Sequence, residues 1–188
     1  MKNIVLIGAA RSGKTTLAQM IAKEFGMGIV CVDSIITAFQ KTFPELNISH
    51  SQGGACKPLV TPFVAAYANA LMYDHPNERF VIEGYHLTLD ENITKLFSPR
   101  LFDIIVMGYP KLTPTQVLEN VRRYEGADDY TRAVPDEELL KTLSRHVNYS
   151  KDFERVAHEL GLSFVDTSYN RPDILHTVTK KLHTEYEK

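Results

Sequence analysis

The sequence predicts an α/β protein, a three-layer α/β/α sandwich around a five-stranded parallel sheet, and three observations carry that prediction. Short apolar runs recur along the chain, as in strands that are buried on both faces. Segments with helical spacing separate these runs, which is the pattern of βαβ units. The length of 188 residues, with 44% hydrophobic and 23% charged residues, suits one domain with one sizeable core.

The expected strands are short, continuous apolar runs. Gly8 closes the first run and Gly84 closes the third, as a turn after a buried strand requires. Asp33 and Glu83 end the second and third runs, at the sheet edge where ligands bind in open parallel sheets. The five runs are residues 3–7, 28–33, 79–83, 102–108 and 162–166.

Helices are expected between these strands because apolar residues recur there at helical spacing. Thr61 and Pro62 offer an N-cap and a first helical position after a polar loop over residues 45–58. Thr113 and Gln116 have the spacing of a capping box. The expected helices cover residues 14–25, 34–43, 61–72, 89–97, 114–123, 135–160 and 172–182.

Charge and composition exclude several classes of protein. The formal net charge of −2 leaves no basic stripe for a phosphodiester backbone, so no nucleic-acid partner is expected. The apolar run over residues 4–10 is far shorter than a membrane span and lacks the layout of a secretory signal. Cys31 and Cys56 have no CxxC spacing, so neither a disulfide framework nor a zinc site is expected. The expectation is a cytoplasmic protein without a membrane partner, whose oligomeric state stays open.

Residues 8–15, GAARSGKT, match the pattern G-x-x-x-x-G-K-[ST] at every fixed position. Glycines let such a loop point several backbone N–H groups at phosphate oxygens, and the following helix adds its positive dipole end. Lys14 would reach the β- and γ-phosphates, and the Thr15 hydroxyl is a ligand for Mg²⁺. The predicted nucleotide-binding residues are Gly8, Ala10, Arg11, Ser12, Gly13, Lys14, Thr15, Thr16 and Arg122.

With this loop at the N-terminus, the chain resembles small P-loop kinases of the adenylate-kinase-like group, which is related to nucleoside monophosphate kinases. Residues 79–90, RFVIEGYHLTLD, resemble the third strand of that group, and residues 110–149 resemble its lid region. The resemblance implies a P-loop NTPase fold with sheet order 2-3-1-4-5 in a single kinase domain, residues 1–188. It further implies ATP and Mg²⁺ as cofactors, a short lid at about 124–134 and an acceptor-site insertion at about 45–74.

The same resemblance implies roles for arginines that neutralise charge on the transferring phosphoryl group. Arg122 or Arg123 matches the first arginine position of the lid region, Arg145 matches the second, and Arg132 lies in the lid itself. The planar guanidinium binds phosphate oxygens bidentately, although each of these arginines alone could be a solvated surface charge. Six cations are expected to face one nucleotide cleft: Arg11, Lys14, Arg122, Arg123, Arg132 and Arg145. Lys14, Asp33, Arg123, Arg132 and Arg145 are the predicted catalytic residues.

Two acidic residues and a histidine are the candidates for the acceptor side. Asp33 could accept a proton from a substrate hydroxyl or hold a Mg²⁺-bound water, or it could merely cap the next helix. Glu83 could orient metal-bound water or contact substrate, or it could bond to nearby backbone. His86 follows on the turn, where it binds substrate or is simply half-exposed. The predicted substrate-binding residues are Asp33, Glu83 and His86, and the predicted metal ligands are Thr15 and, through water, Asp33.

The chain departs from its resemblance where an acceptor phosphate would bind. Nucleoside monophosphate kinases supply one arginine after the second strand and one after the third, but residues 34–41 contain none and Leu87 occupies the second position. An unpaired buried phosphate dianion is costly. The favoured interpretation is therefore transfer from ATP to a small-molecule hydroxyl with Asp33 as base. Phe63, Tyr67 and Tyr73 would line the acceptor pocket or belong to the core.

Two other functions stay open. One is a nucleoside monophosphate kinase with relocated phosphate contacts, for which Lys41, Lys57, Arg79 and Arg100 are the available cations. The other is a nucleotide-binding regulatory ATPase, whose output is a conformational change. An arginine-bearing lid favours phosphoryl transfer because lid closure excludes water from the γ-phosphate.

Overall fold

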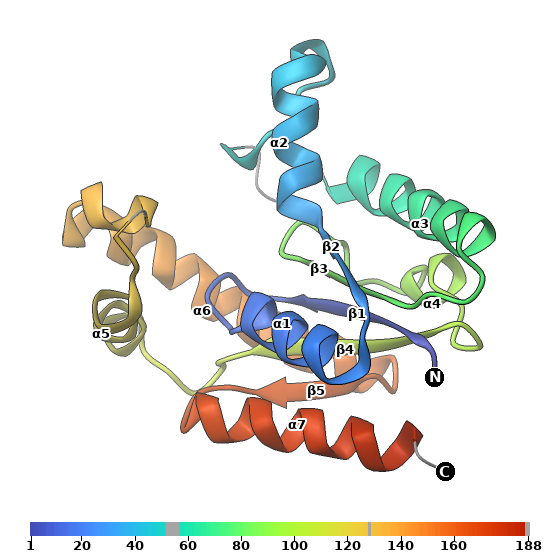
Figure 1. Ribbon diagram of the computed structural model, residues 1–188. Helices are drawn as coiled ribbons and strands as arrows, with labels where there is room; N and C mark the ends of the chain where they lie inside the picture. The colour runs from blue at the N-terminus through green and yellow to red at the C-terminus, as the bar shows by residue number, and fades with distance from the viewer. Residues whose placement is uncertain (52–56, 128, 187–188) are drawn as a thin grey trace.

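The computed structural model describes residues 1–51, 57–127 and 129–186, and it contains the predicted parallel sheet (Figure 1). Apolar, β-branched runs form its five strands, which lie in the order β2-β3-β1-β4-β5 with every pairing parallel. The predicted fold class and the predicted strand order are both confirmed. The strands are β1 (Asn3–Gly8), β2 (Gly28–Cys31), β3 (Phe80–Gly84), β4 (Phe102–Gly108) and β5 (Ser163–Asp166).

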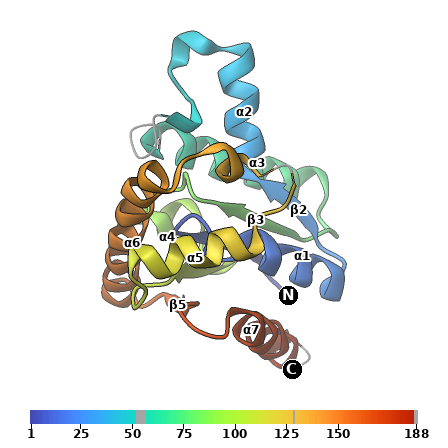
Figure 2. The same cartoon turned by 90° about the vertical axis from the view of Figure 1, so that its left-hand side faces the viewer.

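Helices connect the strands and cover both faces of the sheet (Figures 1 and 2). The α-helices are α1 (Lys14–Phe25), α2 (Val32–Thr42), α3 (Lys57–Asp74), α4 (Ile93–Leu96), α5 (Pro114–Tyr124), α6 (Asp136–Glu159) and α7 (Arg171–Tyr186). Two short 3₁₀ turns, η1 (Pro44–Leu46) and η3 (Tyr130–Ala133), lie in the segments after α2 and α5. No helix in the described part of the chain is both long and apolar enough to cross a membrane.

Alternation along β1 divides the core into two layers. Ile4 and Leu6 pack with α1 and α7 on one face, and Val5 and Ile7 pack with α3, α5 and α6 on the other. All four side chains are fully buried. A strand buried on both faces explains why the run of residues 3–7 is apolar throughout rather than alternating.

The start of α2 differs from the sequence prediction. The second strand was expected to reach Asp33, but β2 ends at Cys31 and α2 begins at Val32. Val32 packs on Gly84 so closely that a Cβ at Gly84 would lie 2.5 Å from the Cβ of Val32. The missing side chain lets α2 begin one residue after the strand, which places Asp33 in the first helical turn rather than at the N-cap.

The start of α3 was also predicted wrongly. The helix begins at Lys57, so Pro58 lies in its first turn and Pro62 lies inside it. The Thr61 hydroxyl does not cap the helix; it donates to the Lys57 carbonyl at 2.9 Å and accepts from the Thr88 amide at 2.8 Å. Residues 52–56 of the predicted loop lie outside the described residues.

The helix expected over residues 89–97 is only the single turn of α4. The Asp90 carboxylate accepts a hydrogen bond from the Asn92 amide at 2.8 Å. This local bond favours a turn at residues 90–92 over a helix that begins at residue 89. The capping box at the start of α5 is confirmed, because Thr113 and Gln116 each bond the backbone of the other.

Candidate functional site

The phosphate-binding motif lies where its pattern demands, between β1 and α1. Gly8 has a φ of +156°, and a Cβ built there would lie 2.0 Å from the Met107 carbonyl oxygen. The loop therefore passes too close to β4 for any side chain at Gly8. Gly13, directly before α1, has a φ of +93°, which also favours glycine.

Lys14 is held inside this loop. Its ammonium donates to the Ala9 carbonyl at 2.7 Å, and the residue is 6% exposed. Burial lowers the pKa of Lys14 to about 8, although the charges of Glu83 and Asp33 oppose the shift. An ammonium bonded only to a carbonyl is prepared to exchange that acceptor for a phosphate oxygen.

Thr15 and Glu83 bring two oxygen ligands together at the carboxyl ends of β1 and β3. The Thr15 hydroxyl donates to the Glu83 carboxylate at 3.3 Å, and Glu83 is 5% exposed. Mg²⁺ prefers hydroxyl and carboxylate oxygens, so these two residues fit that ion. Glu83 bonds a side chain here rather than nearby backbone, which had been the alternative role for it.

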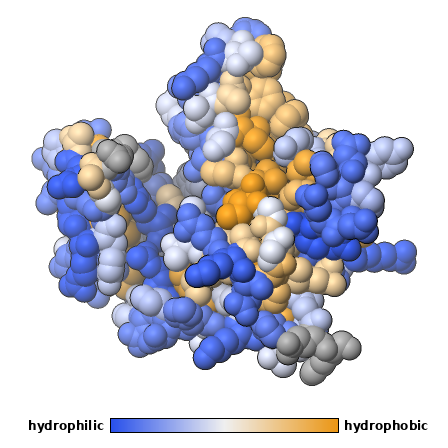
Figure 3. Space-filling view, in the orientation of Figure 1, coloured by the Kyte–Doolittle hydropathy of each residue, from blue (hydrophilic) through white to orange (hydrophobic). Residues whose placement is uncertain are grey.

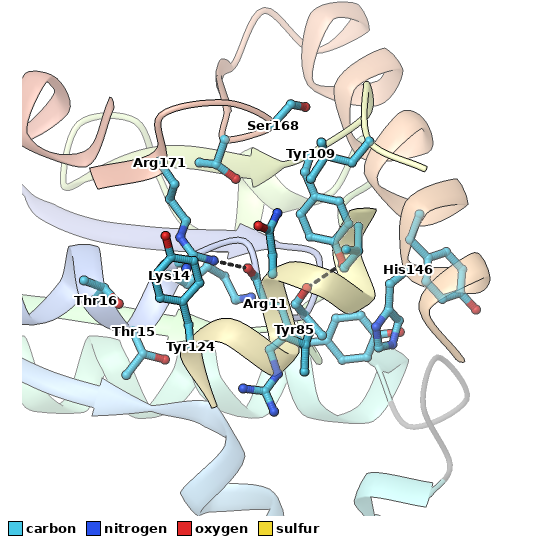
Figure 4. A pocket seen from close by; sticks show the side chains of 18 of the residues that line it. Arg11, Lys14, Thr15, Thr16, Tyr85, Tyr109, Tyr124, His146, Ser168 and Arg171 are labelled. Carbon is cyan, nitrogen blue, oxygen red and sulfur yellow. Dashed lines mark hydrogen bonds between the residues drawn. The ribbon is translucent and has the colours of Figure 1, made fainter. Parts of the chain in front are cut away.

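One large cleft of about 1710 Å³ runs past these residues. Figure 3 shows the hollow between the projecting α2 region and the lobe formed by α5 and the start of α6. In Figure 4, Lys14, Thr15 and Thr16 lie along one side of the pocket, and Tyr85 and His146 lie toward α6. The structure brings together these predicted site residues along the cleft: Ala10, Arg11, Gly13, Lys14, Thr15, Thr16, Asp33, Glu83, His86, Arg123 and Arg145.

Four predicted site residues do not line this cleft. Gly8 and Ser12 shape the loop from behind, where Ser12 is fully buried. Arg132 is exposed on η3 and is not among the residues that line the cleft. Of the six cations expected to face one nucleotide cleft, Arg122 and Arg132 do not line this cleft.

Arg122 is engaged by the lid instead. Its guanidinium donates to the carboxylates of Glu125 and Asp136 and to the carbonyls of Thr131 and Val134, at 2.6 to 3.4 Å. A planar group with five donors suits this role, because it satisfies four acceptors from one side chain. Arg122 thus ties the segment between α5 and α6 together, and the neighbouring Arg123 is the one that reaches the cleft.

Asp33 and His86 face each other on the acceptor side of the cleft. The Nδ1 atom of His86 lies 3.1 Å from Oδ1 of Asp33. Burial alone would raise the pKa of Asp33, but the hydrogen bond from His86 and the charges of His86 and Lys14 outweigh it and lower that pKa. Asp33 is therefore ionised at neutral pH. His86, only 4% exposed, is a buried partner of Asp33 rather than a half-exposed side chain.

Several cleft residues escaped the sequence analysis. His50 bonds to Thr37 at 2.9 Å and stands edge-on to His86, with ring centroids 5.5 Å apart. Burial, helped by the charge of Arg145, lowers the pKa of His146 to about 4, so this ring stays neutral beside Tyr85. No local signal marked these histidines, because each becomes part of the site only through tertiary packing.

The lid contacts the phosphate loop directly. Asp129 pairs with the guanidinium of Arg11 through both carboxylate oxygens, and the Nη1–Oδ2 distance is 2.6 Å. The hydrogen bonds from Arg11 and Thr131 hold the pKa of Asp129 well below its usual range. Arg11 has a φ of +67°, an uncommon conformation that turns its side chain out of the loop toward the lid. The segment expected to form the lid is thus anchored at both Arg11 and Arg122.

A second arginine approaches the loop from the start of α7. Arg171 donates to the Arg11 carbonyl at 3.1 Å, and its guanidinium lies 5.2 Å from the centre of the Tyr124 ring. Both side chains line the cleft (Figure 4). This stacked pair offers a flat surface next to the phosphate loop.

Solved structures of two kinases share the fold of this chain. No protein-family model matches the chain. A crystal structure of shikimate kinase from Bacteroides thetaiotaomicron aligns over 100% of this chain and 99% of that one, at 19% identity and a TM-score of 0.61. A gluconokinase from Sinorhizobium meliloti aligns over 98% and 97%, at 17% identity and a TM-score of 0.54. The fold is thus that of P-loop kinases such as these.

Two further similarities involve shikimate kinases. The enzyme from Acinetobacter baumannii, solved in complex with shikimate, aligns over 100% of this chain and 96% of that one, at 13% identity and a TM-score of 0.54. In sequence, 46 residues are 46% identical to shikimate kinase of Bacillus licheniformis, over 24% of this chain. That match spans 26% of the length of the curated relative.

Proposed function

We propose that this protein is an ATP-dependent phosphotransferase that moves the γ-phosphoryl group to a hydroxyl of a small molecule. The observation that carries the proposal is one cleft lined by both the phosphate loop and Asp33. Phosphoryl transfer asks a protein chiefly to position the two reactants and to neutralise charge. Lys14, Arg11, Arg123 and Arg145 supply the positive charge around the donor.

Asp33 is the proposed base. Its carboxylate is ionised, lies at the carboxyl edge of the sheet, and is held in orientation by His86. When an acceptor hydroxyl attacks the γ-phosphorus, Asp33 takes the hydroxyl proton. Thr15 and Glu83 are the residues that would hold Mg²⁺, which neutralises phosphate charge when it is bound.

The acceptor side supports a hydroxyl rather than a phosphate as the acceptor. None of the cations Lys41, Lys57, Arg79 and Arg100 lines the described part of the cleft; the Lys57 ammonium lies behind it, 4.7 Å from the centre of the Tyr85 ring. Arg79 precedes β3, at the sheet edge opposite the phosphate loop, where it donates to the Met1 carbonyl at 2.9 Å. The similarity to shikimate kinases and to a gluconokinase, whose names denote hydroxyl-bearing acceptors, agrees with this choice.

A screen of acceptors tests the proposal. Nucleosides, nucleoside monophosphates, sugars and polyol acids are compared by thermal shift and by ADP release in the presence of MgATP, because a bound acceptor raises the melting temperature. The account predicts turnover with a hydroxyl compound. Fast transfer to AMP or another nucleoside monophosphate would contradict it.

An isosteric variant then tests the role of Asp33. Asp33→Asn removes the base and keeps the shape, so transfer should fall by about 10²- to 10⁴-fold while ATP affinity stays within about threefold. The matched control is Asp173→Asn, which changes an exposed carboxylate in the first turn of α7, outside the cleft. Unchanged turnover in Asp33→Asn would leave Asp33 without a catalytic role.

A further inference from the structure

Three potential metal ligands converge on the acceptor side of the cleft. Asp33 comes from the first turn of α2, His50 from the segment before α3, and His86 from the turn after β3. One ligand atom from each lies within 4.8 Å of the others, and all three residues line the cleft. Two imidazoles and one carboxylate form the type of set that binds a metal ion while leaving a position open for water or substrate.

A hydrogen-bond chain fixes the tautomer of His50. The Thr37 hydroxyl donates its single proton to the Asp33 carbonyl at 3.0 Å. Its bond to His50, 2.9 Å from Nε2, must therefore use a proton carried by Nε2. The Nδ1 atom of neutral His50 is then left with its lone pair. Histidines that bind metals are commonly oriented in this way, through a hydrogen bond to the other ring nitrogen.

His86 and Asp33 already have nearly the spacing of two ligands on one ion. Ligands with tetrahedral bonds of 2.0–2.1 Å lie about 3.3 Å apart, and Nδ1 of His86 is 3.1 Å from Oδ1 of Asp33. The second ring nitrogen of His86, Nε2, is buried and has no hydrogen-bond partner among the residues that the structure describes. When an ion replaces the proton that Nδ1 shares with Asp33, Nε2 carries the ring proton and calls for an acceptor such as an ordered water.

We propose that Asp33, His50 and His86 form a binding site for a divalent transition-metal ion, with Zn²⁺ as the best match. Imidazole nitrogen favours Zn²⁺ over Mg²⁺, whereas the oxygen pair of Thr15 and Glu83 favours Mg²⁺. The cleft therefore offers two ion sites of different chemistry. No zinc site was expected from the spacing of Cys31 and Cys56, and this site uses neither cysteine.

The zinc site and the proposed phosphotransferase activity share Asp33. A metal ion bound there occupies the carboxylate lone pairs that would accept the hydroxyl proton. Zn²⁺ should accordingly inhibit transfer in competition with the acceptor and not with ATP. Metal binding itself can be measured without any acceptor, so its failure and the failure of the kinase proposal are distinguishable.

The test is isothermal titration of untagged protein with Zn²⁺ in excess MgCl₂, followed by the absorption spectrum of the Co²⁺ form. We expect one ion per chain and the intense visible bands of Co²⁺ in a tetrahedral site. His50→Gln changes an exposed side chain and should weaken binding at least about tenfold. Thr37→Val removes the hydroxyl that orients His50 but keeps the ligand itself. It should therefore weaken Zn²⁺ binding by up to about tenfold, which is a smaller effect than that of His50→Gln.

The matched control is His176→Gln, an exposed histidine on α7 outside the cleft, which should leave Zn²⁺ binding unchanged. Absence of stoichiometric binding would overturn the proposal. So would equal affinities for the wild type and His50→Gln.

Discussion

The two halves of the cleft are built in different ways. The donor half consists of β1, the phosphate loop and α1, which are consecutive in the chain. The acceptor half combines α2 and the nearby His50 with the turn after β3, which comes from a later part of the chain. Local sequence therefore specifies the donor half almost completely, whereas the acceptor half depends on how distant segments pack. The first can be read from a motif, whereas the sequence predicted Asp33 and His86 of the second half but missed His50.

The largest expected effect lies in the donor half. Lys14→Ala removes the buried ammonium that would bind the β- and γ-phosphates, so phosphoryl transfer should fall by about 10²- to 10³-fold. Steady-state kinetics with the acceptor found in the screen measure this change. Lys23→Ala is the matched control, because Lys23 lies on the same helix but is exposed and outside the cleft. Near-normal transfer by Lys14→Ala would remove the basis of the donor half.

Alanine substitutions at two glycines test how tightly each half of the cleft is packed. Gly8→Ala forces a Cβ against the Met107 carbonyl, a backbone atom that cannot move aside, and should cost about 3 kcal/mol of unfolding free energy. In Gly84→Ala the new Cβ first meets the Cβ of Val32, at 2.5 Å, and the variant should cost about 2 kcal/mol.

Urea unfolding measures both variants against Gly126→Ala, where a Cβ would meet nothing within 4 Å. That control should stay within about 0.5 kcal/mol of the wild type. Because Val32 is next to Asp33, Gly84→Ala should also lower transfer more than ATP affinity. A larger loss of unfolding free energy for Gly84→Ala than for Gly8→Ala would contradict the claim that the loop at Gly8 is the more tightly packed of the two.

A smaller effect is expected where the lid touches the donor half. If Arg11 exchanges Asp129 for a phosphate when ATP binds, Asp129→Asn should tighten ATP binding by about threefold, because the competing carboxylate charge is lost. Arg11→Ala should weaken binding by about tenfold. Calorimetric titration with ATP gives both values. Weaker binding in Asp129→Asn would show instead that the ion pair builds the site.

The smallest effect concerns the protons of Lys14. The folded-state pKa of Lys14, about 8, lies below its ordinary value of 10.5, so the unfolded chain binds more protons between these two values. The contribution of Lys14 to folding stability therefore rises with pH from about 8 to 10.5. Phosphate charge raises this pKa, so ATP binding at about pH 9 should take up a fraction of one proton.

Titrations in two buffers with different ionisation enthalpies measure this uptake. Lys14→Arg is the informative variant, because its guanidinium stays charged in both states. It should bind ATP without taking up a proton at that pH. Equal proton uptake by Lys14→Arg and by the wild type would assign the titration to another group.

The sequence predicted the donor half of the cleft better than the acceptor half. The buried strands and the position of the loop between β1 and α1 were predicted correctly, because local apolar runs and glycine geometry determine them. The starts of α2 and α3 were wrong because Val32 packs on Gly84 and Thr61 bonds Thr88, contacts that no local pattern encodes. Arg122 and Arg123 were indistinguishable as neighbours, since only the position of the lid carboxylates decides which one reaches the cleft.

The central claim is that the γ-phosphoryl group of ATP is transferred to a hydroxyl of a small molecule. Identifying the atom that carries this group after the reaction tests the claim most directly. Phosphorus NMR of the protein with MgATP and the acceptor identifies the product by its chemical shift. The account predicts that a phosphate monoester forms at the acceptor hydroxyl together with ADP. The signal of this product should be absent in Asp33→Asn. A nucleoside diphosphate formed from a monophosphate, or inorganic phosphate as the sole product, would contradict it.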